Sequence, residues 1–248
     1  MTIDAVSSLE KNNPSPKVTQ SMTIDVNKYP NVIARPYACA IKATSQKKDF
    51  QRFLLESTIS FLAVVSVSNV VEIYNNLKGK GSVAQDASEP PEKQDILEKI
   101  KNKLVVNMDQ MALGKWMALL RDTCKVLADC PDNKLLVVPE LVDIFKNVAN
   151  KVVIDSINEL ITIRNSDAHG SPILEEEFEP ELTKRQMLLD LVIGKLNFFE
   201  NYRILIAEGF VIRDGIFVYS VREFAGEGFS SSCLPLALML PQNEPILF

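Results

Sequence analysis

The clearest pattern in the chain is a run of apolar residues spaced three and four positions apart between Lys47 and about Leu77. This spacing places side chains on one face of an α-helix, so it predicts a long helix here. The predicted inward positions are Phe50, Phe53/Leu54, Ser57, Phe61, Val64/Val65 and Val71. Because the middle of the segment is apolar nearly all round, we expect it to lie in the centre of a helical bundle.

Four further segments predict helices. They run from about Glu92 to Val106, from Met111 to Cys130, from Pro139 to His169 and from Glu181 to Ile206. The first is rich in Glu and Lys, which indicates a surface helix, whereas the other three carry longer apolar faces. The expected inward residues of those three are Leu113, Trp116, Met117, Leu120, Cys124 and Leu127; Val142, Phe145, Ala149, Val152, Ser156, Leu160 and Ile163; and Leu188, Val192, Phe199 and Tyr202.

After Glu208 the apolar spacing changes from helical to alternating, which is typical of β-strands. Two alternating segments flank the dipeptide Asp214–Gly215. Asp-Gly in this context is a strong signal for a type I′ turn, so we expect a β-hairpin. Leu234–Leu240 predicts another strand.

These patterns divide the chain into three parts. Residues 1–45 are rich in Ser, Thr, Asn and Pro and keep no period, so we expect a largely irregular N-terminal arm. Residues 46–206 are expected to form a helical bundle, and residues 207–248 a small β-rich extension. The predicted fold class is therefore mainly α with a small C-terminal β-hairpin extension.

Composition and charge narrow the choice of function. The chain has 248 residues, of which 46% are hydrophobic and 24% charged, as in ordinary soluble proteins. Up to residue 130 there are 17 basic and 14 acidic residues, and after it 10 basic and 18 acidic. A broad cationic surface for long nucleic acids is not expected from this balance, so any RNA would be bound locally.

Targeting and metal-binding signals are weak. Met1 to Gln20 is polar and lacks the apolar core of a signal peptide. The most apolar stretch, Ser57–Val71, is shorter than a membrane span requires. The chain has four cysteines without CxxC spacing and one histidine, so we expect no metal or other cofactor, and a cytoplasmic protein with reduced, buried thiols.

One segment carries residues suited to chemistry, and it closes the fourth predicted helix: Arg164-Asn165-Ser166-Asp167-Ala168-His169. Because Gly170 follows, the helix should stop at or just past His169. Asn165 and His169 share a helix face, whereas Arg164 and His169 are about 140° apart around the axis. These last two would meet at one phosphate only if the last turn unwinds or if a second copy supplies its own pair.

The residue types suit RNA cleavage in which a ribose 2′-hydroxyl attacks the adjacent phosphate. A histidine at a helix C-terminus faces the negative end of the helix dipole, which favours the imidazolium, and Asp167 is expected to act in the same direction. Such a histidine suits proton transfer near neutral pH, while Arg164 offers a permanent fork for phosphate oxygens. The alternative is structural, because an Arg and a His near a helix end can also bind its last carbonyls.

The motif resembles the R-N-x3-H form of the sequence that defines HEPN domains, which are α-helical bundles of prokaryotic defence, toxin–antitoxin and RNA-processing systems. The resemblance covers the helical part, from about Lys47 to Ile206. Leu113-Gly114-Lys115-Trp116 with Leu119-Leu120-Arg121 is also similar to a helix of HEPN-like modules in bacterial multidomain proteins.

The resemblance implies a metal-independent endoribonuclease that cuts single-stranded RNA and leaves 2′,3′-cyclic phosphate ends. It implies a homodimer in which Arg164 and His169 of both subunits line one cleft, with Asn165 orienting the site. Many members of the family bind without cleaving. A HEPN-like interaction module that joins a second protein subunit or a fused effector domain is therefore the alternative function.

Other functions have less support in the residues. Arg164 could serve a nucleotide or second-messenger site, but Gly79-Lys80-Gly81-Ser82 lacks the spacing of a phosphate-binding loop. A serine hydrolase is excluded by the absence of a G-x-S-x-G elbow. The acidic run Glu175–Glu181 would repel RNA if it lay beside a cleft, and it otherwise fits a solvated helix start.

Overall fold

The fold is mainly helical, as the apolar spacing predicts. The computed structural model describes residues 24–79, 111–128, 136–169, 175–213, 216–227 and 233–238. Within these ranges there are six α-helices and a small three-stranded sheet. The predicted helix at 92–106 and the Asp214–Gly215 turn lie outside the described residues.

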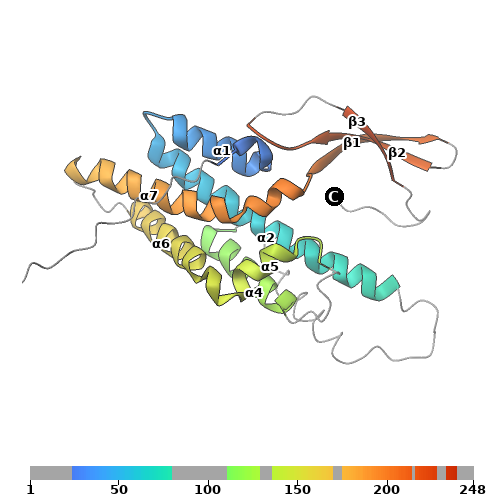
Figure 1. The fold of residues 1–248 in the computed structure, drawn as a ribbon, viewed down its shortest axis with the longest axis horizontal. Coiled ribbons are helices and arrows are strands. Elements are labelled where there is room, and N and C mark those ends of the chain that lie inside the picture. The colour runs from blue at the N-terminus through green and yellow to red at the C-terminus, as the bar shows by residue number, and fades with distance from the viewer. Residues whose placement is uncertain are drawn as a thin grey trace, which may run out of the picture.

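Helix α2 (Lys47–Gly79) is the longest helix and runs through the middle of the bundle (Figure 1). Its position confirms the prediction of a long central helix. The inward face is rotated slightly from the predicted one, because Leu54, Leu55, Ile59 and Leu62 are buried while others of the apolar set remain in solvent. The exposed members are Phe53, Val64 and Val71.

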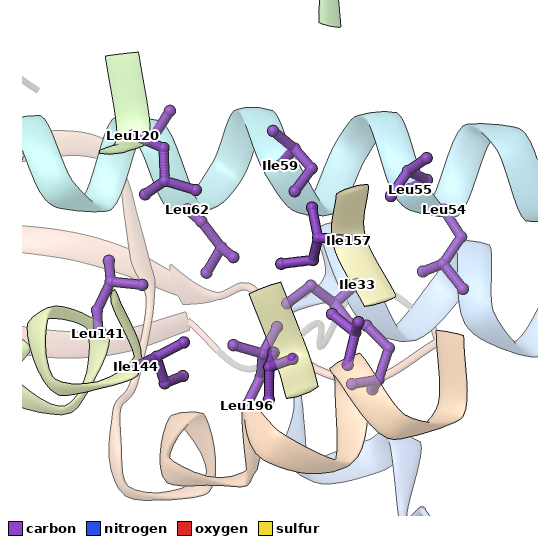
Figure 2. Close-up of a cluster of buried hydrophobic side chains, with 14 of the residues drawn as sticks. Ile33, Leu54, Leu55, Ile59, Leu62, Leu120, Leu141, Ile144, Ile157 and Leu196 are labelled. Atoms are coloured by element: carbon purple, nitrogen blue, oxygen red, sulfur yellow. The ribbon is translucent and has the colours of Figure 1, made fainter. Parts of the chain in front are cut away.

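The core brings together side chains from helices that are far apart in the chain. Figure 2 shows Ile33, Ile59, Leu120 and Ile157 among the side chains that fill the space between these helices. Each is at most 1% exposed. Burial of such side chains contributes about 1.5–3 kcal/mol apiece before the entropy of folding is subtracted, so this cluster is the main source of stability.

Over Lys47–Ile73, helix α2 is long and apolar enough to cross a membrane. From the sequence no such segment is expected, because that expectation considers only the shorter stretch Ser57–Val71. Half of the most apolar part is buried inside the protein. The core helix of a soluble protein has the same property, since it is surrounded by other helices rather than by lipid.

Helix α4 (Leu113–Ala128) packs against α2 and buries the predicted face. Leu113, Met117, Leu120, Cys124 and Leu127 are all buried, as predicted. The single tryptophan, Trp116, is partly buried against the same core, which agrees with a packing role.

The predicted fourth helix is two helices. Helix α5 (Pro139–Lys146) is capped by Asn147, a 3-10 turn covers Val148–Asn150, and α6 (Lys151–Ala168) follows. The Asn147 side chain accepts a hydrogen bond from the backbone of Ala149, an alternative to helical bonding that asparagine offers readily. The break shifts the inward face, so Val153 and Ile157 are buried and Val152 is half exposed.

The prediction of an irregular N-terminal arm is wrong for residues 31–42, which form α1 (Asn31–Lys42). Pro36 lies inside this helix, and a proline at that point normally argues against helix. Burial of Ile33, Ala34 and Tyr37 in the core compensates for the lost backbone hydrogen bond. Helix α1 lies beside α2 in Figure 1 and belongs to the bundle.

Helix α7 (Glu175–Lys195) begins earlier and ends earlier than predicted. Its first turn contains Glu175, Glu176 and Glu177, where the positive end of the helix dipole favours acids. All three are exposed, which confirms the interpretation of the acidic run as a solvated helix start. After Lys195 a 3-10 segment, Asn197–Asn201, buries Phe199.

The C-terminal strands are β1 (Leu205–Arg213), β2 (Ile216–Glu223) and β3 (Cys233–Leu238). They pair antiparallel in the order β1-β2-β3, with an irregularity between Ala207 and Gly209. The sheet lies at one end of the bundle (Figure 1). Its base is tied to the start of α1, because the backbone N–H of Asn31 donates to the carbonyl of Phe224 at 3.2 Å.

Candidate functional site

Arg164 lies on the side of α6 that faces α2. Its Nε donates to Glu56 Oε1 at 2.8 Å, and its Nη1 donates to Asn165 Oδ1 at 3.4 Å. The side chains of Arg164 and Glu56 are 31% and 36% exposed, so solutes can reach the pair. The motif arginine is therefore held by a carboxylate 108 residues earlier in the chain.

His169 lies at the end of α6, where the sequence predicts the helix to stop. It is the C-cap residue, and its backbone N–H donates to the carbonyl of Asn165 at 3.1 Å. The side chains of Asn165 and His169 are exposed. Within the described residues no hydrogen bond or ion pair engages the His169 imidazole.

A single chain does not bring Arg164 and His169 together. The two are five residues apart on one helix, which separates them by about 140° around its axis. Arg164 accordingly contacts α2, and His169 faces solvent at the helix end. The helix keeps its form through Ala168, so the last turn does not unwind to close this gap.

Asp167 pairs with residues other than His169, whereas from the sequence it is expected to favour the imidazolium form of His169. Its carboxylate accepts two hydrogen bonds from Arg185, at 2.5 and 3.0 Å, and lies 2.8 Å from Lys48 Nζ. Burial of the carboxyl group by itself raises its pKa, but the hydrogen bonds from Arg185 and Lys48 outweigh this effect, so the pKa of Asp167 is lowered. Asp167 is thus an anion that ties α6 to two other helices.

Arg185 is the residue near the motif that the sequence did not single out. Its side chain is 6% exposed, and its Nε donates to Glu181 at 3.2 Å on the same helix. The only local signal for it is the Glu181 to Arg185 spacing of four residues, which is common on solvated helix surfaces. Nothing in that spacing distinguishes a buried arginine from an exposed one.

Metal ligands and nucleophiles are sparse in the described part of the chain. No group of three His, Cys, Asp or Glu side chains is close enough there to hold a metal ion. Cys124 is buried, and burial raises the pKa of its thiol to about 12, so it packs in the core instead of reacting. Cys39 is partly buried.

Comparison with known proteins adds no identification. The chain matches no family model, no curated protein and no solved structure at a significant level.

Proposed function

We propose that this protein is a metal-independent endoribonuclease that acts as a HEPN-type homodimer in the cytoplasm, in a prokaryotic defence or RNA-turnover system. One observation carries the proposal: the R-N-x3-H motif closes a bundle helix, with Asn165 and His169 exposed at that helix end. Single-stranded RNA is the proposed substrate, and Arg164, Asn165 and His169 are the proposed site.

The proposed reaction is attack of a ribose 2′-oxygen on the adjacent phosphorus. The imidazole of His169 takes the 2′-hydroxyl proton or gives a proton to the leaving 5′-oxygen. As the P–O5′ bond breaks, a 2′,3′-cyclic phosphate forms, and the guanidinium of Arg164 stabilises the negative charge on the other phosphate oxygens. No metal is needed, because protonation and charge stabilisation come from side chains.

The positions of these side chains support a site built from two subunits. The 140° separation directs Arg164 and His169 of one subunit away from a common phosphate. A twofold arrangement of two α6 ends supplies an Arg and a His from opposite subunits. The Glu56 contact occupies only Nε of Arg164, so N–H groups on both Nη atoms remain for a phosphate oxygen.

The second candidate is a non-catalytic HEPN-like module that joins a larger complex. Two observations favour it: Arg164 already has an ion-pair partner in its own subunit, and α2 exposes apolar side chains at Phe53, Val64 and Val71. In this case the motif region would serve contact between proteins rather than RNA cleavage.

The deciding experiment is incubation of purified protein with end-labelled single-stranded RNA in EDTA. We expect wild type to cleave and to leave 2′,3′-cyclic phosphate ends. His169→Ala and Arg164→Ala should each lower the rate at least about 100-fold, a typical value for loss of an acid–base or charge-stabilising group. The matched control is Arg203→Ala, which removes another partly exposed Arg–Glu pair at the sheet.

Two results would contradict the nuclease. One is absence of cleavage by the wild-type protein over a range of RNA sequences. The other is equal cleavage by wild type and His169→Ala, which would point to a contaminating nuclease. A stable complex with a companion protein, in the absence of cleavage, would support the second candidate.

A further inference from the structure

Three helices meet at the carboxylate of Asp167. Lys48 comes from the start of α2, Asp167 from the last turn of α6, and Arg185 from the middle of α7. Arg185 in turn contacts Glu181 of its own helix. We call these four residues the α6 clamp.

The clamp is neutral as a whole, and its central pair, Asp167 and Arg185, is largely removed from water. It contains two cations and two anions, and the side chains of Asp167 and Arg185 are only 9% and 6% exposed. The Arg185 fork binds both carboxylate oxygens of Asp167, a geometry that fixes direction as well as distance. Removal of Asp167 would leave the buried Arg185 guanidinium with only the more exposed Glu181 as a counterion.

The clamp acts where a helix is ordinarily least ordered. The last turn of a helix has carbonyls without intrahelical partners, and it frays easily. Asp167 is in that turn, two residues before His169 and two after Asn165. The contacts of Asp167 thus join this turn to α2 and α7 at a point between the two exposed motif residues.

The two inward-facing motif residues, Arg164 and Asp167, both contact helix α2. Asp167 and Arg164 are about 60° apart around α6, so both face the neighbouring helices. Lys48 and Glu56 of α2 contact them one each. In the described structure no hydrogen bond or ion pair joins the side chains of Asn165 and His169 to α2 or α7, and Asn165 accepts one from Arg164 of its own helix. The places of both therefore depend on the turn that carries them.

We propose that Asp167 and Arg185 are positioning residues that fix the end of α6 and thereby the place and orientation of the His169 ring. This inference rests on the proposed ribonuclease function for its consequence in catalysis. Neither residue touches RNA in the proposed reaction. They act through the helix turn between Asp167 and His169.

The test uses the fact that His169 is the only histidine in the chain. In tag-free protein labelled with ¹³C,¹⁵N-histidine, NMR then reports a single imidazole environment. Asp167→Asn keeps the shape of the side chain and removes its charge. We expect it to shift or broaden the His169 ring signals relative to wild type, because the last turn is no longer anchored.

A matched control exists on the same two helices. Glu159 of α6 contacts Lys184 of α7 at 2.6 Å, but this pair is exposed and lies more than two turns from His169. Glu159→Gln makes the same carboxylate-to-amide change. We expect it to leave the His169 signals and the cleavage rate at wild-type values.

The kinetic expectation follows from positioning. Asp167→Asn should lower kcat at least about tenfold, since small displacements of a reacting group are costly. KM should stay within about twofold, because no group that binds substrate is removed. Arg185→Lys keeps the charge but loses the fork, so its kcat and His169 signals should lie between those of wild type and Asp167→Asn.

The outcomes separate the two proposals. Wild type that does not cleave RNA removes the ribonuclease, while the NMR comparison still decides whether the clamp positions His169. Unchanged His169 signals in Asp167→Asn overturn the inference even if wild type cleaves. If Asp167→Asn does not fold, Lys48→Gln removes one cation from a partly exposed position. It should then shift the same signals by less, and no shift overturns the inference.

Discussion

At the residue scale, Asp167 changes role between sequence and structure. Its place two residues before His169 makes it a natural partner for an imidazolium. In the folded chain it turns inward and pairs with Arg185 and Lys48. A difference of 200° around a helix separates positions two residues apart, so nearness in sequence here means opposite faces.

The lowered pKa of Asp167 predicts how its stabilising effect depends on pH. Its folded pKa is below the ordinary value, so the unfolded chain binds the proton more readily. The stabilisation is therefore fully present above the unfolded pKa of about 4 and is lost as the pH falls through the folded value.

We expect Asp167→Asn to lower the free energy of unfolding by about 3 kcal/mol at pH 7, the typical cost of breaking a buried pair. The difference from wild type should shrink as the pH falls below about 4, because a protonated Asp167 resembles the asparagine. Urea unfolding of both proteins at a series of pH values measures this difference in the free energy of unfolding. A difference that stays constant down to pH about 2 would show that the charge of Asp167 contributes nothing.

At the scale of elements, the junction of α2 with α5 depends on one buried asparagine. Asn69 is fully buried on α2. Its Oδ1 accepts hydrogen bonds from the backbone N–H groups of Val137 and Val138, at 2.8 and 2.9 Å, just before α5 begins. Backbone N–H groups removed from water need an acceptor, and here another helix supplies it.

We expect Asn69→Ala to destabilise the protein by about 2–3 kcal/mol, because two N–H groups lose their acceptor. The measurement is the midpoint of urea unfolding followed by circular dichroism. Ser68→Ala, one position away, is the matched control, since Ser68 is exposed and bonds only within its own helix. Equal effects of the two substitutions would rule out a special role for Asn69.

At the scale of the whole molecule, the proposed activity depends on a second copy of the chain. One subunit presents Arg164 toward α2 and His169 toward solvent. Within one subunit the two side chains therefore point in different directions. Activity should therefore depend on protein concentration in the range where the dimer dissociates.

Mixing two inactive variants tests this arrangement. Arg164→Ala supplies an intact His169, and His169→Ala supplies an intact Arg164, so a mixed dimer contains one of each on opposite subunits. After subunit exchange about half of the dimers are mixed, and each mixed dimer keeps one of the two Arg–His pairs of the wild-type dimer. We therefore expect cleavage to recover to at most about a quarter of the wild-type rate, if one Arg and one His suffice. No recovery, with exchange verified by mass spectrometry, would mean that one Arg164 and one His169 on opposite subunits do not form a working site.

Local spacing was enough to predict part of this molecule. The central helix from Lys47, the buried face of α4 from Leu113 to Leu127 and the end of α6 at His169 all follow from apolar period and helix-stop residues. These features depend on neighbours within a few turns, so they are visible in the sequence. The mainly α class follows from them.

Other features depend on contacts between distant residues. Helix α1 persists around Pro36 because its apolar face is buried by the bundle. The ion pair of Arg164 with Glu56 and the clamp around Arg185 join residues 108 and 18 positions apart. No local period encodes such pairs.

The sequence by itself therefore determined most of the helical segments, α1 excepted, and where Arg164, Asn165 and His169 lie along one helix. Only the tertiary structure decided what surrounds them. The physical reason is that periodicity reports a residue's own helix, whereas burial and charge pairing depend on which helices the folded chain places side by side.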